Sequence, residues 1–454
     1  MEEFRAERDT MGEILVPKDC LWGAQTERSR RNFKIGTETM PWEIIESFLI
    51  LKRSCALTNQ DMGRLSEEKS RAIADAADII LSGKYTEEFP LVVWQTGSGT
   101  QTNMNVNEVI SHIAMKESNV LLHPNDDVNM SQSSNDTFPT AMNMAAIIHI
   151  KRRLYPAVKG MIQVLEKKEE ENRHIIKIGR THLQDAVPLR LSQEISGWRV
   201  MLVEAMEMLE KTESHLLALA IGGTAVGTGI NCPAGFADKC CEYIAEYTKE
   251  PFVSSKNKFH SLTSKDAYVY THGALKALAA NLMKIANDIR WLASGPRCGI
   301  GELKIPENEP GSSIMPGKVN PTQCEALTMV ALQIMGNDAS IGMAASQGNF
   351  ELNVYMPLLA YNMLQSIRLL SDAVLSFTDN CLAGIEAIPE NIRKHLDKSL
   401  MLITCLTPKI GYDNAALAAG KAYRENITIK EAVLDMGLIN ESEYDEAVCL
   451  ERIV

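Results

Sequence analysis

The sequence lacks the patterns by which cysteine and histidine usually hold a metal ion or a disulfide framework. Its ten cysteines include no C-x-x-C pair, and Cys240 and Cys241 are adjacent. The nine histidines include no H-x-H or H-E-x-x-H group that would place two imidazoles on one metal ion. We therefore expect no metal, no cofactor and a reducing compartment.

Excess positive charge and long apolar runs are missing as well. The formal net charge of −12 argues against a general nucleic-acid-binding protein, because sequence-independent affinity for phosphate backbones comes from clustered Lys and Arg. No stretch is long and apolar enough to span a bilayer, and the N-terminus, M-E-E-F-R-A-E-R-D, lacks the apolar run of a signal peptide. We expect a cytoplasmic protein with no nucleic-acid or membrane partner.

The chain does have enough apolar residues for a sizeable core. At 454 residues and 45% hydrophobic, it is expected to form two or three domains. Proline placement indicates long helices, because four proline-free intervals are each long for a single globular helix. These intervals are 189–232, 252–295, 322–356 and 358–388.

Two of these intervals carry apolar stripes whose spacing alternates between three and four residues. One stripe consists of Leu275, Leu278, Leu282, Ile285, Ile289 and Leu292, and the other of Ile195, Trp198, Leu202, Ala205 and Leu209. This spacing is typical of the seam of a helix bundle. We interpret both stripes as core residues without chemistry, and we predict a mainly α fold.

Breaks in the helical pattern divide the chain into three predicted domains. The N-terminal lobe, 1–131, has short helical segments interrupted by Gly and Pro, and a strand-like start near 12–16. The central domain, 132–357, holds most of the long helical intervals. A small C-terminal helical domain, 358–454, ends in a capped short helix that Gly437 closes.

The segment 311–321, G-S-S-I-M-P-G-K-V-N-P, is a loop whose chemistry suits an anion. Gly311 and Gly317 allow unusual backbone angles, and serine hydroxyls stand beside successive backbone N–H groups. Lys318 adds positive charge, and Asn320 adds a neutral donor and acceptor. The alternative interpretation is a Gly/Pro-rich turn between two helices, because such punctuation is common.

The segment 96–107, T-G-S-G-T-Q-T-N-M-N-V-N, is rich in hydroxyls and amides and almost free of charge. Gly97 and Gly99 would let the backbone approach a ligand closely. A phosphate-binding loop is the rival interpretation. However, the Lys-Ser/Thr ending of a P-loop is absent, and no dinucleotide fingerprint follows a strand.

A second polar segment, 123–136, ends with Ser133, Ser134 and Asn135 just before a long helical run. Hydroxyl and amide groups at a helix N-terminus either cap the helix or bind an anion. The residues alone favour the capping role.

A third polar segment, 179–188, contains Thr181 and His182. A lone histidine is more often structural than catalytic. Glu325, seven residues beyond Lys318, offers support for catalysis, because a carboxylate bound to imidazole fixes its tautomer and stabilises its cationic form. Contact between His182 and Glu325 is a hypothesis that spacing does not establish.

Taken together, these segments resemble the aspartase/fumarase superfamily and, within it, class II fumarase. The loop 311–321 is similar to the superfamily signature. The class II fumarase motifs are resembled by W-Q-T-G-S-G-T-Q-T-N (94–103), H-P-N-D-D (123–127), G-R-T-H-L-Q-D-A (179–186) and G-N-F-E-L-N-V (348–354). The resemblance runs from about Asp9 to the C-terminus, and it displaces the alternative interpretations of the four segments.

A few positions favour fumarase over its relatives. His182 stands where aspartases usually have Gln, and Gly317 stands where they usually have Ala. Phe350 and Glu351 also follow the fumarase pattern, whereas argininosuccinate and adenylosuccinate lyases resemble the signature loop less. The resemblance implies reversible hydration of fumarate to L-malate, as in the tricarboxylic acid cycle. Aspartate ammonia-lyase and a non-catalytic structural member of the superfamily are the alternatives.

The resemblance also implies an architecture and a mechanism. A three-domain, mainly α subunit would pack its central bundle of long helices with three copies, forming a homotetramer with a helical core. Each active site would draw on three subunits. The implied reaction is a metal-independent anti elimination or addition through an aci-carboxylate intermediate, without a cofactor.

Site residues follow from the matching motifs. The catalytic residues implied by the resemblance are Ser312, His182, Glu325 and Lys318. The substrate-binding residues implied are Ser98, Thr100, Ser133, Ser134, Asn135, Thr181, Lys318 and Asn320. Ser312 is the candidate base and His182 handles the leaving or attacking water, although which of the two takes the carbon-bound proton stays open.

Two positions depart from the family pattern. Met130 stands where the family usually has Lys, which lowers the local charge beside Ser133. Val120 lies where some class II fumarases carry Arg near the H-P-N-D loop. A secondary anion site formed by His123, Asn125 and Asp126 is therefore in doubt here.

Overall fold

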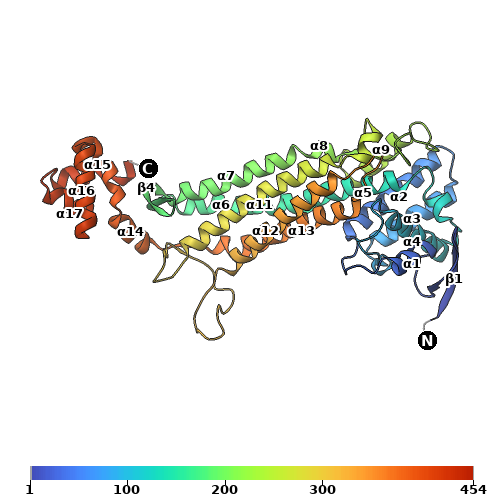
Figure 1. Ribbon diagram of the computed structural model, residues 1–454, viewed down its shortest axis with the longest axis horizontal. Coiled ribbons are helices and arrows are strands. Elements are labelled where there is room, and N and C mark those ends of the chain that lie inside the picture. The colour runs from blue at the N-terminus through green and yellow to red at the C-terminus, as the bar shows by residue number, and fades with distance from the viewer. Residues whose placement is uncertain (1–2, 453–454) are drawn as a thin grey trace. The chain divides into compact units, whose positions relative to one another are not determined.

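The computed structural model describes residues 3–452, and most of their regular structure is helical (Figure 1). The proline-free intervals are occupied by α7 (Leu191–Glu210), α11 (Asp266–Leu292), α12 (Thr322–Ala345) and α13 (Met356–Asn380). The predicted mainly α fold with long helices is thus confirmed. Within residues 3–452, no helix combines the length and apolar character needed to cross a membrane.

Contacts between residues divide the chain into two compact units. The first comprises Met1–Pro156, Ala205–Ala279 and Leu332–Ser371, and the second comprises Ala157–Glu204, Ala280–Ala331 and Asp372–Val454. The helices α6 (Tyr155–Glu171), α7, α11, α12 and α13 therefore each contribute to both units. The division into domains 1–131, 132–357 and 358–454 follows different lines and stays a prediction.

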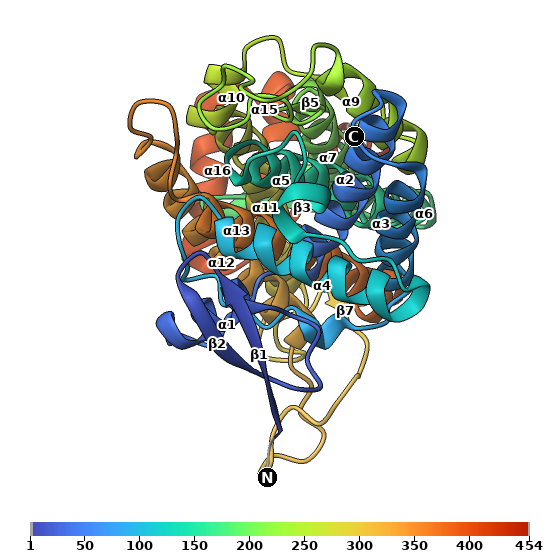
Figure 2. The same ribbon diagram turned by 90° about the vertical axis from the view of Figure 1, so that its right-hand side faces the viewer.

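The first unit begins with an antiparallel hairpin of β1 (Phe4–Asp9) and β2 (Gly12–Pro17), seen in Figure 2. This hairpin confirms the predicted strand-like start. The next elements are α1 (Ala24–Asn32), α2 (Trp42–Asp61), α3 (Glu67–Leu81), η1 (Thr86–Glu88) and α4 (Thr100–Ser118). The buried carboxylate of Glu108 on α4 accepts three backbone N–H bonds from the start of α1, at 2.8–3.1 Å, and so fastens the two helices.

The helix α5 (Ser134–His149) packs on α2, where the rings of Phe48 and Phe138 meet edge to face with centroids 5.8 Å apart. α9 (Phe236–Thr248) packs against α2 as well. The shorter elements around them are η2 (Pro124–Val128), η3 (Ile150–Leu154), α8 (Glu213–Leu216), α10 (Lys258–Thr263) and the parallel pair β5 (Ala218–Leu219) and β6 (Val253–Ser254). α2 therefore contacts both α4 and α5, the helices at whose starts polar segments stand.

The second unit contains two antiparallel strand pairs. β3 (Ile176–Thr181) and β4 (Gln184–Arg190) form a hairpin, and β7 (Leu303–Lys304) pairs with β8 (Glu386–Ala387). α14 (Pro389–Lys398) packs on β3. Both predicted apolar stripes on α7 and α11 are buried, with no residue more than 5% exposed, which confirms their assignment to the core.

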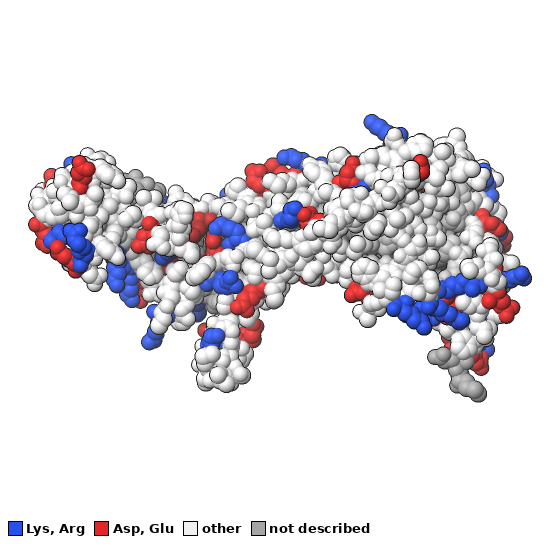
Figure 3. Space-filling model, viewed as in Figure 1, with Lys and Arg blue, Asp and Glu red and all other residues white. Residues whose placement is uncertain are grey.

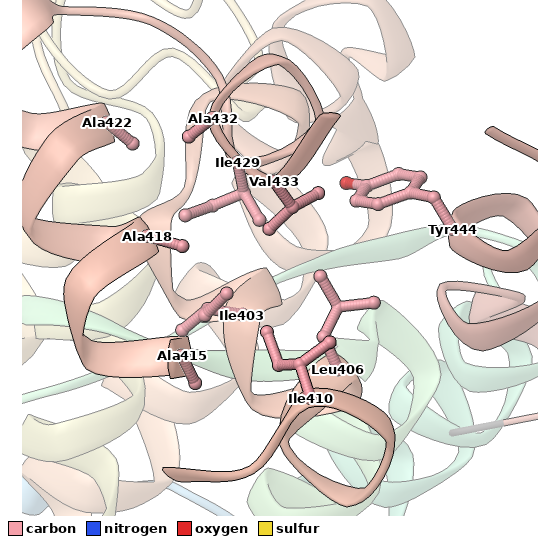
Figure 4. Close-up of a cluster of buried hydrophobic side chains, with 10 residues drawn as sticks. All are labelled: Ile403, Leu406, Ile410, Ala415, Ala418, Ala422, Ile429, Ala432, Val433 and Tyr444. Atoms are coloured by element: carbon pink, nitrogen blue, oxygen red, sulfur yellow. The ribbon is translucent and has the colours of Figure 1, made fainter. Parts of the chain in front are cut away.

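The C-terminal helices have a hydrophobic cluster of their own (Figure 4). They are η4 (Leu382–Gly384), η5 (Leu400–Leu402), α15 (Ile403–Ile410), α16 (Tyr412–Glu425), α17 (Ile429–Asp435), α18 (Glu441–Ala447) and η6 (Leu450–Arg452). Thr428 caps α17 in a capping box with Glu431, and Gly437 follows with φ +64°. The predicted capped short helix closed by Gly437 is confirmed.

Candidate active site

Three of the residues predicted to bind substrate lie at the N-terminus of α5 in the first unit. Ser133 is the N-cap, because its Oγ accepts the N–H of Asn135 at 3.2 Å and the Asp136 carboxylate accepts the N–H of Ser133 at 2.9 Å. The structure therefore confirms the cap for Ser133, while substrate binding by this segment stays a prediction. Ser134 and Asn135 occupy the first turn, where the helix dipole favours negative charge.

This helix start is fastened to the glycine-containing loop 222–225. The buried Asp136 carboxylate accepts the N–H groups of Gly222 at 3.0 Å and Thr224 at 2.8 Å, and burial raises the pKa of Asp136 to about 6. Asn135 Nδ2 donates to the Ala225 carbonyl at 2.8 Å. The backbone of the segment is thereby held from both sides.

Two further predicted substrate-binding residues lie at the start of α4. The hydroxyls of Ser98 and Thr100 are 2.9 Å apart, and Gly99 precedes the helix with φ +72°. A Cβ on Gly97 would lie 1.4 Å from the carbonyl oxygen of Val354. The residue that approaches Gly97 closely is thus Val354 of the 348–354 motif and not a ligand. Two of the predicted motifs are therefore in contact.

Sequence reasoning missed a buried polar group behind these helix starts. Asn103 on α4 donates from Nδ2 to Ser134 Oγ at 3.2 Å, and its Oδ1 accepts from Lys52 Nζ at 2.7 Å. Lys52 is fully buried on α2. The available signal was a lysine inside the apolar helical run F-L-I-L-K, a position that a core helix rarely gives to a charge.

The predicted secondary anion site lies at η2. His123 caps this element by accepting the N–H of Asp126 at its Nδ1, at 3.0 Å, and Nδ1 lies 3.2 Å from the Asp126 carboxylate. Asp127 accepts the N–H of His123 at 2.8 Å and is paired with Lys69 at 2.8 Å. The groups around His123 are therefore mainly acidic, which disfavours an anion at this position.

In the second unit, His182 lies at the tip of the β3–β4 hairpin. Thr181 pairs with Gln184, so His182 and Leu183 form a two-residue turn, with φ +57° and +61°. Both residues adopt the left-handed conformation that such turns usually reserve for Gly, Asn or Asp. Strained backbone of this kind is concentrated at functional sites, and His182 is exposed here.

A buried ion-pair network braces the base of this hairpin. Glu302, which is 1% exposed, accepts two hydrogen bonds from Arg180 at 3.1 and 2.6 Å and one from His395 of α14 at 3.0 Å. Lys177 Nζ lies 3.4 Å from the same carboxylate. Burial alone would raise the pKa of Glu302, but the bonds from Arg180 and the neighbouring cations hold it below its ordinary value.

The segment 311–321 forms a closed loop that projects beyond the helix ends in Figure 1. The N–H of Gly311 donates to the Lys318 carbonyl at 2.8 Å, and Asn320 Nδ2 donates to the Gly311 carbonyl at 2.6 Å. A Cβ on Gly311 would lie 2.6 Å from the Lys318 carbonyl oxygen, so the closure requires glycine. Gly317 has φ +80°, as its predicted turn role demands.

Backbone donors within the loop converge on Ser312. Its Oγ accepts the N–H of Ile314 at 3.3 Å and of Met315 at 3.2 Å. A cavity of about 480 Å³ lies beside the loop, and its lining includes Lys318, Asn320, Arg290, Lys304 and Glu307. Three cations and one carboxylate line this hollow, so its net charge is positive.

The predicted site residues fall into two groups, one in each compact unit. Ser98, Thr100 and the Ser133 to Asn135 segment lie in the first unit, whereas His182, the loop and Glu325 lie in the second. His182 and Glu325 are both exposed, and in the described part of this single chain no hydrogen bond or ion pair joins them. Their pairing stays a prediction.

Known proteins provide an independent comparison. A family profile described as Lyase matches residues 12–336, and one described as Fumarase C C-terminus matches residues 402–454. A fumarate hydratase class II from Bacillus cereus is 60% identical over 457 residues, covering 100% of this chain and 99% of that protein. The corresponding protein of Bacillus subtilis is 59% identical with the same coverage.

Solved structures are similar along the whole chain too. The recombinant class II fumarase of Schistosoma mansoni has a TM-score of 0.96 and 43% identity, covering 98% of both chains. A fumarate lyase:delta crystallin from Brucella melitensis has a TM-score of 0.95 and 37% identity, covering 99% of both. The similarity therefore covers nearly the whole length of the chain.

Proposed function

The chain belongs to the class II fumarate hydratase family of lyases, and on that premise we propose that it hydrates fumarate reversibly to L-malate. The observation that carries this proposal is the similarity to fumarate hydratases over the entire chain. The substrate is a small dicarboxylate. We place the activity in the cytoplasm, in the tricarboxylic acid cycle.

The proposed chemistry begins at a carbon-bound proton beside a carboxylate. Its removal from malate creates a doubly charged aci-carboxylate, which must be stabilised as it forms. We assign Ser312 as the base, acting as an alkoxide. The two N–H groups that converge on its Oγ support this role, because they would stabilise negative charge on that oxygen.

Lys318 and Asn320 are proposed to stabilise the aci-carboxylate. Both line the cationic hollow beside the loop, where Arg290 and Lys304 add positive charge. Preorganised donors and cations of this kind favour a transition state in which negative charge develops. The closed loop would hold them in place without further rearrangement.

His182 is proposed to act as the general acid or base for the water molecule that leaves or attacks. Thr181 lies next to it in the sequence, and Glu325 would stabilise its imidazolium form. Because anti geometry takes the proton and the hydroxyl from opposite faces, two acid–base groups on separate elements suit it. Glu325 would reach His182 from another subunit. In a Glu325→Gln variant, an unchanged pH–rate profile would argue against this pairing.

Ser98, Thr100, Ser133, Ser134 and Asn135 are proposed to bind the substrate carboxylates through neutral hydrogen bonds. The starts of α4 and α5 support this assignment, because helix N-termini present free N–H groups and favour negative charge. Five neutral groups would bind a dianion without the desolvation cost of burying additional cations.

A homotetramer with sites shared by three subunits is proposed as the active form. Beyond Glu325, the exposed positions of α12 are uncharged: Ala326, Met329, Leu332, Gln333, Gly336, Ala339 and Met343. Figure 3 shows a broad surface with few charges over the long helices. An exposed apolar helix face of this length favours burial against other copies of the chain.

Of the sites that the resemblance implies, the secondary anion site at His123, Asn125 and Asp126 has the least support in this chain. Val120 provides no cation, and Met130 lowers the charge nearby. If this site binds an anion, His123 would have to release the Asp126 N–H that it accepts. We propose that the site has little affinity for dicarboxylates in this chain.

The first experiment follows the ultraviolet absorbance of fumarate on adding the purified protein, with and without ammonium. Loss of absorbance without ammonium, with malate as the product, is the expected result. Loss only with ammonium would instead identify an aspartate ammonia-lyase. No loss in either condition would contradict catalysis on fumarate altogether.

A further inference from the structure

Lys52 is a buried cation that the proposed chemistry leaves without a role. It lies on α2 with its side chain fully buried, and its Nζ is 6.0 Å from the ring centroid of Phe48. Its ammonium donates to three neutral side-chain oxygens, those of Asn103 at 2.7 Å, Asn129 at 2.9 Å and Gln132 at 2.8 Å. Burying a charge among amides is costly, so the position demands an explanation.

The ammonium determines how the Asn103 amide is oriented. Because a lysine ammonium only donates, it must face the Oδ1 of Asn103, and Thr137 Oγ1 donates to the same oxygen at 3.1 Å. The Nδ2 of Asn103 is therefore turned to Ser134 Oγ at 3.2 Å. With its oxygen accepting this bond, the Ser134 hydroxyl keeps its own proton for a ligand.

The other two amides fix the turn that leads into α5. Gln132 accepts from Lys52 and donates from Nε2 to the Val128 carbonyl at 3.1 Å and the Met130 carbonyl at 3.0 Å. Asn129 accepts from Lys52 and from Asn103 Nδ2 at 3.1 Å. One ammonium thus links α2, α4 and the turn that carries the Ser133 to Asn135 segment.

We propose that Lys52 is a positioning residue for the hydration of fumarate, fixing Asn103 and the 129–132 turn so that Ser134 donates its hydroxyl proton to a substrate carboxylate. This inference rests on the proposed substrate-binding role of Ser134. The buried positive charge also lies behind the helix start that would receive a dianion, so it attracts the same ligand.

The ionisation of Lys52 gives the proposal a pH signature. Burial lowers the pKa of Lys52 to about 7, against the opposing effects of Cys55 on α2, Asp136 on α5 and Cys240 on α9. Above that pH, the neutral amine loses the charge that attracts the dianion. KM for fumarate should therefore rise between pH 7 and 9 while kcat changes less, because the residue acts on binding.

The test compares Lys52→Met with Lys265→Met. Lys265 is also buried, with a pKa lowered by burial to about 7, but its Nζ donates to the backbone carbonyls of Ser261, Leu262 and Ser264. For Lys52→Met we expect KM to rise roughly tenfold, kcat to change less than about threefold and the pH dependence of KM to flatten. Lys265→Met should keep the wild-type KM and its pH dependence.

Two outcomes would overturn the proposal while leaving the proposed function intact. One is a wild-type KM in Lys52→Met, and the other is an equal rise in KM in both lysine variants. By contrast, failure of the wild-type protein to hydrate fumarate would refute the function itself.

If Lys52→Met does not fold, Asn103→Leu takes its place, because it removes the amide that joins Lys52 to Ser134. A raised KM that is not additive with Ser134→Ala supports the proposal. A KM equal to the wild type, or full additivity, contradicts it.

Discussion

Ser312 is the residue on which the proposed proton abstraction depends most directly. Replacing it with Ala removes the oxygen on which the N–H groups of Ile314 and Met315 converge. We expect kcat to fall by roughly 10²–10⁴-fold with little change in KM, because general acid–base groups act on the transition state. Steady-state hydration of fumarate measures the change.

Ile314→Ala is the matched control for this variant. Its side chain is 84% exposed in the same loop, whereas the N–H that faces Ser312 belongs to the backbone and is retained. We expect near wild-type turnover. Equal losses in the two variants would indicate that loop conformation, rather than the Ser312 hydroxyl, limits the rate.

At the scale of elements, the β3–β4 hairpin depends on the buried Glu302. In Glu302→Gln, Arg180 loses its bidentate carboxylate and Lys177 loses a partner that is 3.4 Å away. Because Arg180 then loses its bidentate counter-charge, while Lys177 keeps only Glu194 at 3.1 Å, the free energy of unfolding should fall by about 3 kcal/mol. The turn that holds His182 should loosen too, and kcat should fall roughly tenfold.

Asp397→Asn provides the comparison for Glu302. Asp397 pairs with Arg393 on α14 at 2.8 Å, but both side chains are more than half exposed. Such surface pairs contribute about 0–1 kcal/mol, so the melting temperature and kcat should stay close to those of the wild type. Wild-type kcat in Glu302→Gln would show that the brace does not position His182.

The strand β1 is joined to α4 by a pair with a pH-dependent strength. His112 Nε2 lies 3.1 Å from Glu7 Oε1. The hydrogen bond from His112 is the main cause that lowers the pKa of Glu7 to about 2. Burial alone would lower the pKa of His112, but its bonds to Glu7 and to the Glu108 carbonyl raise it.

The pH range in which this pair stabilises the folded chain follows from the directions of the two pKa shifts. The contribution of Glu7 is complete above its unfolded pKa of about 4.5 and is lost as the pH falls toward 2. That of His112 is complete below about pH 6.5 and is lost as the pH rises through its raised folded pKa. Stabilisation by the pair is therefore greatest between about pH 4.5 and 6.5.

We expect His112→Gln to lower the free energy of unfolding by about 1 kcal/mol at pH 6, a value reduced for the partial exposure of the pair. The difference from the wild type should shrink as the pH rises through the raised folded pKa of His112. Thermal melts at several pH values measure it. His260→Gln, which alters an exposed pair with Asp266, should show almost no effect, and a pH-independent loss in His112→Gln would contradict the ionic origin.

Local signals explain which elements were predictable from the sequence. The helices α7, α11, α12 and α13 follow from proline-free intervals, and α7 and α11 follow from apolar periodicity as well; both signals act within one segment. The β3–β4 hairpin was not predicted, because His182 and Leu183 are poor signals for a turn with positive φ. Contacts from Glu302, more than a hundred residues away, stabilise that hairpin instead.

The candidate site shows the same limit. The motifs around Ser133, His182 and Ser312 were recognisable because each is a short, contiguous segment that contains several polar residues. Lys52 was not, since its partners come from two other segments, α4 and the 129–132 turn, and its burial depends on the packing of α2, α4 and α5. The apolar run F-L-I-L-K shows that a lysine here is unusual, but it does not show which groups that lysine contacts.

At the scale of the whole molecule, the proposed sharing of sites between subunits can be tested by mixing two impaired variants. Ser134 and Ser312 belong to the two different compact units. If each site takes them from different subunits, mixed tetramers of Ser134→Ala and Ser312→Ala contain some sites in which both residues are wild type. Random assortment would restore about a quarter of the sites.

At a fumarate concentration well below the raised KM of Ser134→Ala, co-expressed Ser134→Ala and Ser312→Ala chains should regain up to about a quarter of wild-type activity, well above the average of the two variants assayed alone. A mixture of Ser312→Ala and Lys318→Ala is the control, because both lesions lie on the 311–321 loop and every site would carry one of them. Native mass spectrometry verifies that mixed tetramers form. If they form and the first mixture shows only the average activity of its two variants, the two serines come from one subunit, and the proposal of shared sites is wrong for this pair.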